Sequence, residues 1–145
     1  MTISKAIQTW LSNYDRLQFV ETDRLEADPE SYGLYKQPTF EEIAYIDGST
    51  LRTDYYYFVA RENAQLQEDR EENHSFLEAL EEWIESEVEA GNPPEIIGFE
   101  EIGIANSFYL QDESEEEAVY QIGIYVTYLR RPAMKSQGKF HEKLE

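Results

Sequence analysis

Apolar residues near the start of the chain recur with the spacing of one helical face. They stand at i, i+3, i+4, i+7, i+8 and i+11, namely at Ile3, Ala6, Ile7, Trp10, Leu11 and Tyr14. This spacing predicts an amphipathic helix, because positions three and four apart lie on the same side of a helix. Thr2 suits the N-cap, and we expect the helix to end near Asp15 or Arg16.

A second helical face follows a polar stretch in the middle of the chain. Residues 62–75 are mostly polar or charged and predict a loop that passes into a helix near Asn73. The apolar face of this helix consists of Phe76, Leu77, Leu80, Trp83, Ile84 and Val88. Gly91, followed by Asn92 and two prolines, predicts its end, since glycine favours the left-handed conformation found just past helix C-termini. Each helix carries one tryptophan, and we expect each to bury its indole ring.

Between the two helices, β-prone runs alternate with turn-forming residues. Short strands are predicted at residues 17–20 and 32–36. The clearest local pattern is a hairpin, in which the runs 40–46 and 51–61 flank Asp47-Gly48-Ser49-Thr50. Asp-Gly suits a tight hairpin turn, because glycine has no Cβ to oppose a positive φ angle.

Alternating apolar residues in the last third of the chain predict a second, longer hairpin. One arm alternates at Ile102, Ile104, Phe108 and Leu110, and the other at Tyr120, Ile122, Ile124, Val126 and Tyr128. The connection, residues 111–117, carries five acidic side chains and must be solvated. The periodicity stops after residues 130–132, and we expect residues 133–145 to form a flexible tail.

The predicted order of elements is α-β-β-β-α-β-β, with two groups of strands separated by a helix. An antiparallel or mixed sheet of four to five strands with two helices packed on it is the economical way to bury these faces. We therefore predict a single α+β domain over residues 1–129, followed by a flexible basic C-terminal tail over residues 130–145. A length of 145 residues is sufficient for one core.

Charge narrows the classes of partner. The net charge is −19. Residues 1–129 hold seven Lys or Arg against 29 Asp or Glu, which gives −22, whereas residues 130–145 hold five against two, which gives +3. An acidic body repels phosphates and anionic lipids, so we expect neither sequence-specific nucleic acid binding nor membrane association. No signal peptide or membrane-spanning run is visible, and synthesis in a cytoplasm is the expectation.

Residues that commonly carry chemistry are few. Cysteine is absent, and the two histidines are His74, expected at the surface near the start of the second helix, and His141 in the tail. No nucleophile elbow, phosphate-binding loop or His pair at metal spacing is present, so we predict neither catalytic residues nor a cofactor or metal site. The acidic connection lacks the glycine and the spaced ligands of an EF-hand. The run Tyr55-Tyr56-Tyr57 is interpreted as core and interface, because alternate strand residues face opposite sides.

Several runs spread along residues 2–129 resemble one family. They are Thr2-Ile3-Ser4-Lys5-Ala6-Ile7 with Trp10-Leu11, Thr22-Asp23-Arg24-Leu25, Ser31-Tyr32-Gly33-Leu34-Tyr35-Lys36, Tyr45-Ile46-Asp47-Gly48 with Asp54-Tyr55-Tyr56, Leu80-Glu81-Glu82-Trp83-Ile84 and Glu117-Ala118-Val119-Tyr120-Gln121-Ile122. The family comprises tail terminator, or minor capsid (tail completion, head-tail joining), proteins of tailed bacteriophages and prophages. Some of its members carry a chloramphenicol-resistance label. The basic tail after Tyr128 departs from the family pattern.

The resemblance implies a structural virion protein with no enzymatic activity. Such a subunit is made in the bacterial host cytoplasm and is incorporated into the tail or neck of the virion. There it caps the tail tube as one member of a ring, expected to be hexameric, and binds the tail tube protein and a head-completion protein.

Two sets of charged residues are candidates for contacts in such a ring. We hypothesise that the acidic connection faces a lumen or an interface through Asp112, Glu113, Glu115, Glu116 and Glu117. Like charge there would keep passing DNA from adhering. The second candidate is the basic tail, which would bind the acidic body of an adjacent subunit or another virion protein through Arg130, Arg131, Lys135, Lys139 and Lys143. A tail that serves only to solubilise the protein is the alternative.

Two other functions stay open at this point. The first is an acidic inhibitor, such as a DNA mimic, that binds a basic protein partner through a dense carboxylate surface. The second is an enzyme, as the drug-resistance label would suggest. An acetyl-transferring enzyme of that kind needs a catalytic histidine, and neither His74 nor His141 lies in a suitable apolar context.

Overall fold

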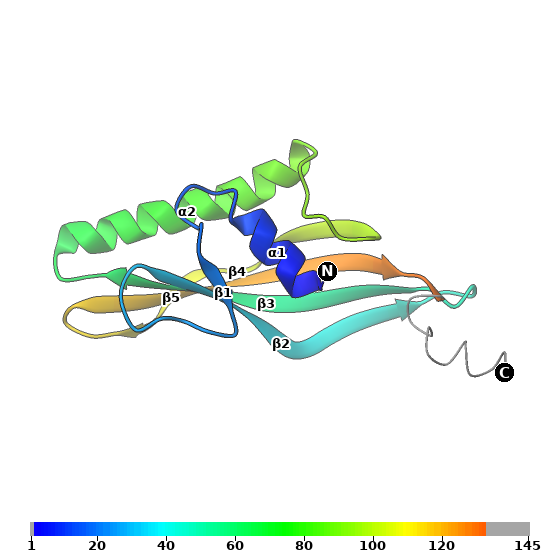
Figure 1. The fold of residues 1–145 in the computed structure, drawn as a ribbon, viewed down its shortest axis with the longest axis horizontal. Helices are drawn as coiled ribbons and strands as arrows, with labels where there is room; N and C mark the ends of the chain where they lie inside the picture. Colours follow the sequence, from blue (N-terminus) through cyan, green and yellow to red (C-terminus); the bar gives the residue numbers. More distant parts are fainter. Residues whose placement is uncertain (1, 133–145) are drawn as a thin grey trace.

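The structure is a computed structural model and describes residues 2–132. Two helices pack on a five-stranded mixed sheet, so the predicted α+β class and the predicted element order are confirmed (Figure 1). In chain order the elements are α1 (Ile3–Leu11), β1 (Val20–Thr22), β2 (Ser31–Ala44), β3 (Thr50–Asn63), α2 (Gln67–Glu89), β4 (Phe99–Glu113) and β5 (Glu117–Arg130).

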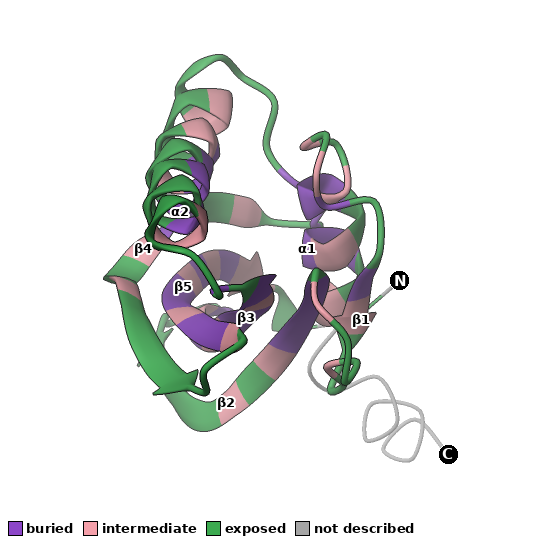
Figure 2. Cartoon of the chain, turned by 90° about the vertical axis from the view of Figure 1, so that its left-hand side faces the viewer, coloured by how far each residue is buried: buried purple, intermediate pink, exposed green. Residues whose placement is uncertain are grey.

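The strand order in the sheet is β1-β2-β3-β5-β4. β1 runs parallel to β2, and every other neighbouring pair is antiparallel. Both helices lie on the same side of the sheet, with α1 packed on β1 and β2 and α2 packed mainly on β4 (Figure 2). No helix of the described residues lies on the other side of the sheet, so side chains that alternate along each strand meet two different environments.

The core fills the space between the helices and the sheet. On β3 and β5, its largest fully buried side chains belong to Tyr56, Phe58, Tyr120, Ile122 and Ile124, which alternate along these two strands. Ile7, Leu11, Leu77, Leu80 and Ile84 meet them from the helices. The period-2 pattern of β5 and the apolar faces of both helices therefore correspond to the observed core.

α1 has the predicted start but an earlier end. The Thr2 side chain accepts a hydrogen bond from the Lys5 amide at 3.0 Å, as expected of an N-cap. The helix ends at Leu11 instead of near Asp15 or Arg16, because the following amides bond three residues back, for example Tyr14 N to Leu11 O at 3.0 Å. The chain thus leaves the helix in tight turns.

α2 begins at Gln67, six residues before the predicted start near Asn73. The reason is local capping by an acidic residue: the Asp69 side chain accepts from the Leu66 amide at 3.0 Å, and carboxylates in a first turn are favourable beside the positive end of the helix dipole. The predicted end is correct. Gly91 follows the last turn with a φ of 82° and donates to Val88 O.

β2 is one long strand where the sequence patterns predicted two short ones. The predicted runs 32–36 and 40–46 join across a register shift between Lys36 and Phe40, which contains Pro38. Proline lacks an amide proton, but β1 pairs only with residues 32–34, so this part of β2 lies at a sheet edge where no partner needs that proton. The turn after β2 has the predicted form, with Gly48 at a φ of 87°.

Candidate interaction surface

The described residues hold no group of three His, Asp or Glu side chains arranged to bind a metal ion. Neither helix of residues 2–132 has the length and apolar character needed to cross a membrane. His74 lies in the third turn of α2, not at its start, and its exposed ring makes edge contacts with Phe108 and Tyr120 at centroid distances of 5.0 and 5.7 Å. His141 lies outside the described residues.

The most distinctive surface is the side of the sheet away from the helices. Directly paired residues on neighbouring strands point to the same side, so the pairing places one row of tyrosines there. We call this side the tyrosine face and define it by Tyr35, Tyr55, Tyr57, Tyr109 and Tyr125. Tyr56, between two of these, is buried in the core. The run Tyr55-Tyr56-Tyr57 therefore divides between the two sides of the sheet. Its interpretation as core is confirmed for Tyr56, and the interface role of Tyr55 and Tyr57 stays a prediction.

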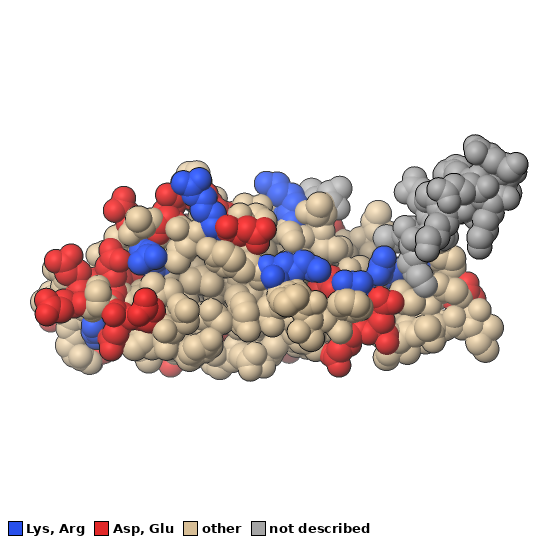
Figure 3. Space-filling model, turned by 90° about the horizontal axis from the view of Figure 1, so that it is seen from below, with Lys and Arg blue, Asp and Glu red and all other residues tan. Residues whose placement is uncertain are grey.

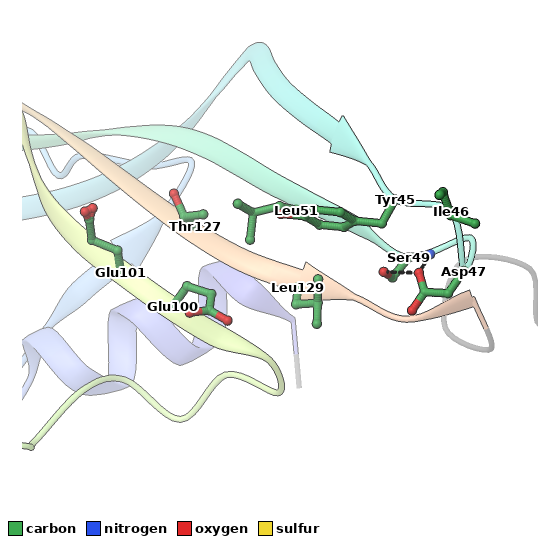
Figure 4. A pocket seen from close by; sticks show the side chains of 9 residues that line it. All are labelled: Tyr45, Ile46, Asp47, Ser49, Leu51, Glu100, Glu101, Thr127 and Leu129. Carbon is green, nitrogen blue, oxygen red and sulfur yellow. Dashed lines mark hydrogen bonds between the residues drawn. The ribbon is translucent and has the colours of Figure 1, made fainter.

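Two adjoining hollows run along the tyrosine face, and Thr127 lines both. They are wide open to solvent, with volumes of about 1140 and 810 Å³. In Figure 4, Glu100 and Glu101 extend from β4 on one side of β5, and Tyr45 lies beside Leu51 on the other. None of the residues that line the hollows is Lys or Arg, whereas Glu41, Asp47 and these two glutamates are acidic. A shallow, acidic, aromatic surface suits an extended chain better than a small molecule.

One end of the tyrosine face joins an exposed apolar hairpin tip. We use the name hairpin tip for residues 43–49, which comprise the end of β2 and its connection to β3. Ile43 and Tyr45 are exposed there, and Ile46 is fully exposed. The turn itself is well ordered by hydrogen bonds, because Asp47 accepts from both the amide and the hydroxyl of Ser49. The tip therefore holds apolar side chains in solvent on a defined support, as protein interfaces often do.

The acidic connection is shorter than the sequence patterns predicted. Strands β4 and β5 extend to Glu113 and from Glu117, so only residues 114–116 form the turn, which the Ser114 hydroxyl closes by accepting from two amides. Glu113 pairs with Arg70 at 2.8 Å, and Glu117 pairs with Arg61 at 3.1 Å.

Of the five predicted residues, three therefore remain available to a partner. Asp112, Glu115 and Glu116 are exposed and form no ion pair within residues 2–132. Acidic side chains crowd the end of the molecule at which β4 and β5 are joined (Figure 3).

The predicted basic tail is only partly described. Arg130 is the last residue of β5 and pairs with Glu42 at 3.6 Å, so it belongs to the folded domain. Arg131 lies near the hairpin tip: hydrogen bonds from Ser49, with a contribution from the Arg131 charge, lower the pKa of the Asp47 carboxyl. Lys135, Lys139 and Lys143 lie outside the described residues.

The core-facing residues of β3 end on each side in a cluster of charged side chains around a buried carboxylate. The sequence patterns did not predict these two clusters. The first surrounds Glu62, which is 0% exposed. Its carboxylate accepts from Arg16 at 2.8 Å and from the Tyr32 hydroxyl at 3.2 Å. Burial raises the pKa of Glu62 from 4.5 to about 7, against the lowering influence of Arg16 and Tyr32. Burial also raises the pKa of Tyr32.

The second cluster stands at the other end of these core-facing residues of β3. The buried Asp54 accepts from the Tyr128 hydroxyl at 2.8 Å and from Arg52 at 2.9 Å. Burial and the hydrogen bond to Asp54 raise the pKa of Tyr128. The Arg52 guanidinium also lies 3.8 Å from the ring centre of Phe40. Each cluster combines a carboxylate, an arginine and a tyrosine, and each is satisfied internally, which indicates a structural role.

No protein-family model matches the chain, and no curated protein matches it at a significant level.

Proposed function

We propose that this chain is a structural assembly subunit of a phage or prophage particle, which caps the tail tube as a member of a ring and joins it to the head. The observation that carries the proposal is the hairpin tip, where Ile43, Tyr45 and Ile46 stand in solvent on a rigid two-stranded support. Burying apolar surface between subunits is the main driving force for closed rings. The assignment to a phage particle rests on the resemblance of residues 2–129 to tail terminators.

Replacing Ile46 by Asp should abolish assembly on the tail tube while leaving the subunit folded. The side chain is fully exposed, so a carboxylate there costs the free subunit nothing, but it would be desolvated in an interface. Purified subunit is mixed with the tail tube protein of the same phage or prophage, and sedimentation and electron microscopy report capped tubes. Ile97→Asp is the matched control, since Ile97 is 79% exposed in the segment between α2 and β4. Capped tubes formed equally by both variants would refute a role for the tip.

The structure reduces the number of substitutions needed to test the predicted role of the acidic connection. We propose that it faces the lumen of the ring, where like charge repels passing DNA. Reversal of Asp112, Glu115 and Glu116 to Lys should leave ring assembly intact and lower DNA passage, measured as infectious particles per assembled particle. Glu113 and Glu117 are left unchanged, because their carboxylates already pair with Arg70 of α2 and Arg61 of β3. Unchanged infectivity of assembled particles would exclude a lumenal position.

One observation favours the acidic-inhibitor alternative. The outer side of α2 carries exposed carboxylates along its length, at Glu68, Glu71, Glu72, Glu78, Glu82, Glu85 and Glu89. A row of this kind could contact a basic protein in place of DNA. An inhibitor would bind a nuclease or restriction enzyme tightly and would ignore the tail tube protein, so binding assays with the two partners separate the functions.

A further inference from the structure

Within residues 2–132, a covering segment lies over one end of the tyrosine face. There the segment between β1 and β2 crosses the sheet, and the Glu26 carbonyl accepts from Arg61 at 2.9 Å. The Arg24 carbonyl lies so close to Gly33 that a Cβ on that glycine would stand 2.3 Å from it. Beyond Tyr57, no described segment continues this cover over the two hollows. The rest of the face therefore presents half-buried tyrosines and threonines to solvent.

The residues that line the uncovered part of the tyrosine face favour a cationic partner. Its hollows are lined by tyrosine and threonine hydroxyls, by the apolar side chains of Leu51 and Leu129, and by carboxylates at Glu41, Glu100 and Glu101. No lysine or arginine among the lining residues neutralises these carboxylates. Lysine side chains suit such a surface, because their alkyl stems pack on apolar groups while their ammonium groups reach the carboxylates.

The C-terminal segment of the same chain starts at one end of the tyrosine face. β5 ends at Arg130, and the Pro132 ring lies at the hairpin tip, 3.2 Å from where a Cβ on Gly48 would stand. Asp47, at the same tip, lines the first hollow. Residues 133–145 hold three Lys and two Glu, and both glutamates stand in the last four positions, so residues 133–141 carry Lys135 and Lys139 with no acidic side chain. The 13 residues after Pro132 can span up to roughly 43–47 Å when extended, about the length of β3.

We propose that residues 133–145 dock on the tyrosine face of their own chain, with lysine amines against Glu41, Glu100 and Glu101. Single exposed ion pairs are weak, so docking depends on the covalent tether. A short tether gives an effective concentration in the millimolar range, which a second copy or another protein reaches only at high concentration. This inference does not require the phage function, because it concerns the free subunit.

Carbodiimide coupling of the full-length protein tests the contact. The reagent activates a carboxylate, the lysine amine attacks it to form an amide, and the reagent takes up the water that is lost. An equal mixture of ¹⁴N and ¹⁵N protein is coupled and digested, and the linked peptides are identified by mass. We expect links from Lys135, Lys139 or Lys143 to the three glutamates, with both peptides carrying the same isotope. Glu78, Glu82 and Glu85 on the outer side of α2 are the control carboxylates.

Three outcomes would overturn the proposal. If half of the links joined peptides of different isotope, the segment would occupy a second copy. If the links were spread evenly over the α2 control carboxylates, no docking site would exist. The third outcome concerns a charge-reversal variant, Lys135→Glu with Lys139→Glu. This variant should lower the yield of Lys143 links to the tyrosine face by roughly two- to thirtyfold, the range expected from the loss of two exposed ion pairs. Lys135→Arg with Lys139→Arg should leave that yield unchanged, and an equal loss in both variants would contradict the electrostatic basis.

Discussion

Replacing Arg16 by Met should destabilise the protein by about 2–2.5 kcal/mol at pH 8, because the buried Glu62 carboxyl, without its counter-ion, must keep the proton that it releases above about pH 7 in wild type. Arg16 is the cation that contacts this carboxylate, at 2.8 Å. At pH 5 the expected cost falls to about 1 kcal/mol, which reflects the lost stacking of the guanidinium on Phe76. Urea unfolding followed by far-UV circular dichroism at both pH values measures the difference.

The pH dependence follows from the raised pKa of Glu62. The folded protein keeps a proton on this carboxyl up to about pH 7, whereas the unfolded chain loses it near pH 4.5. The folded state therefore binds more protons within this window, and stability falls as the pH rises through it. A shift of this size corresponds to about 3 kcal/mol in total. Glu62→Gln cannot ionise, so its stability relative to wild type should rise by about that amount between pH 4.5 and pH 8.

A double variant, Arg16→Met with Glu62→Gln, and a surface control test whether the charge of Glu62 causes the loss of stability. Glu62→Gln should rescue most of the loss caused by Arg16→Met at pH 8, since no charge then remains to be neutralised. Arg24→Met is the matched control, because Arg24 is 66% exposed and pairs only with exposed glutamates; it should change stability by less than about 0.5 kcal/mol. An equal loss for Arg16→Met at pH 5 and pH 8 would show that packing, and not the charge of Glu62, is responsible.

Local sequence patterns predicted those features of the fold that depend on neighbouring residues. The stop of α2 needs only Gly91 and its left-handed conformation, and the hairpin turn needs only Asp47 and Gly48. The apolar faces of both helices depend on spacing alone. The start of α2 was missed because its first turns are mostly solvent-exposed and polar, so apolar periodicity does not mark them, although the Asp69 cap does.

The candidate surface depends on long-range pairing, which explains why less of it was predictable. Tyr57 pairs with Tyr35 and with Gly123, and only this arrangement shows that tyrosines from separate strands share one side of the sheet. Glu62 and Asp54 occupy core-facing positions of β3, where sequence alone suggests apolar residues. Arg16 and Glu62 are 46 positions apart in the sequence, so no local pattern indicates that they pair.

Truncation of Trp10 to Ala is expected to have the other large effect on stability, about 3–5 kcal/mol. The indole is buried, and its N–H donates to the Asn92 carbonyl at 2.7 Å, which attaches α1 to the segment that follows α2. Its ring centre lies 5.0 Å from that of Trp83, which is only half-buried, so the expectation that each helix buries its indole holds fully for Trp10 alone.

A double-mutant cycle separates the two contributions of Trp10. Trp83→Ala should cost less than Trp10→Ala, and the two should couple by about 0.5–1.5 kcal/mol, because each removes the partner of the same ring pair. Phe19→Ala, at a side chain 84% exposed, is the control and should stay within about 0.5 kcal/mol of wild type. Strictly additive losses, measured by urea unfolding at pH 7, would mean that the ring contact itself contributes nothing. In that case burial and the hydrogen bond to Asn92 would account for the whole effect of Trp10.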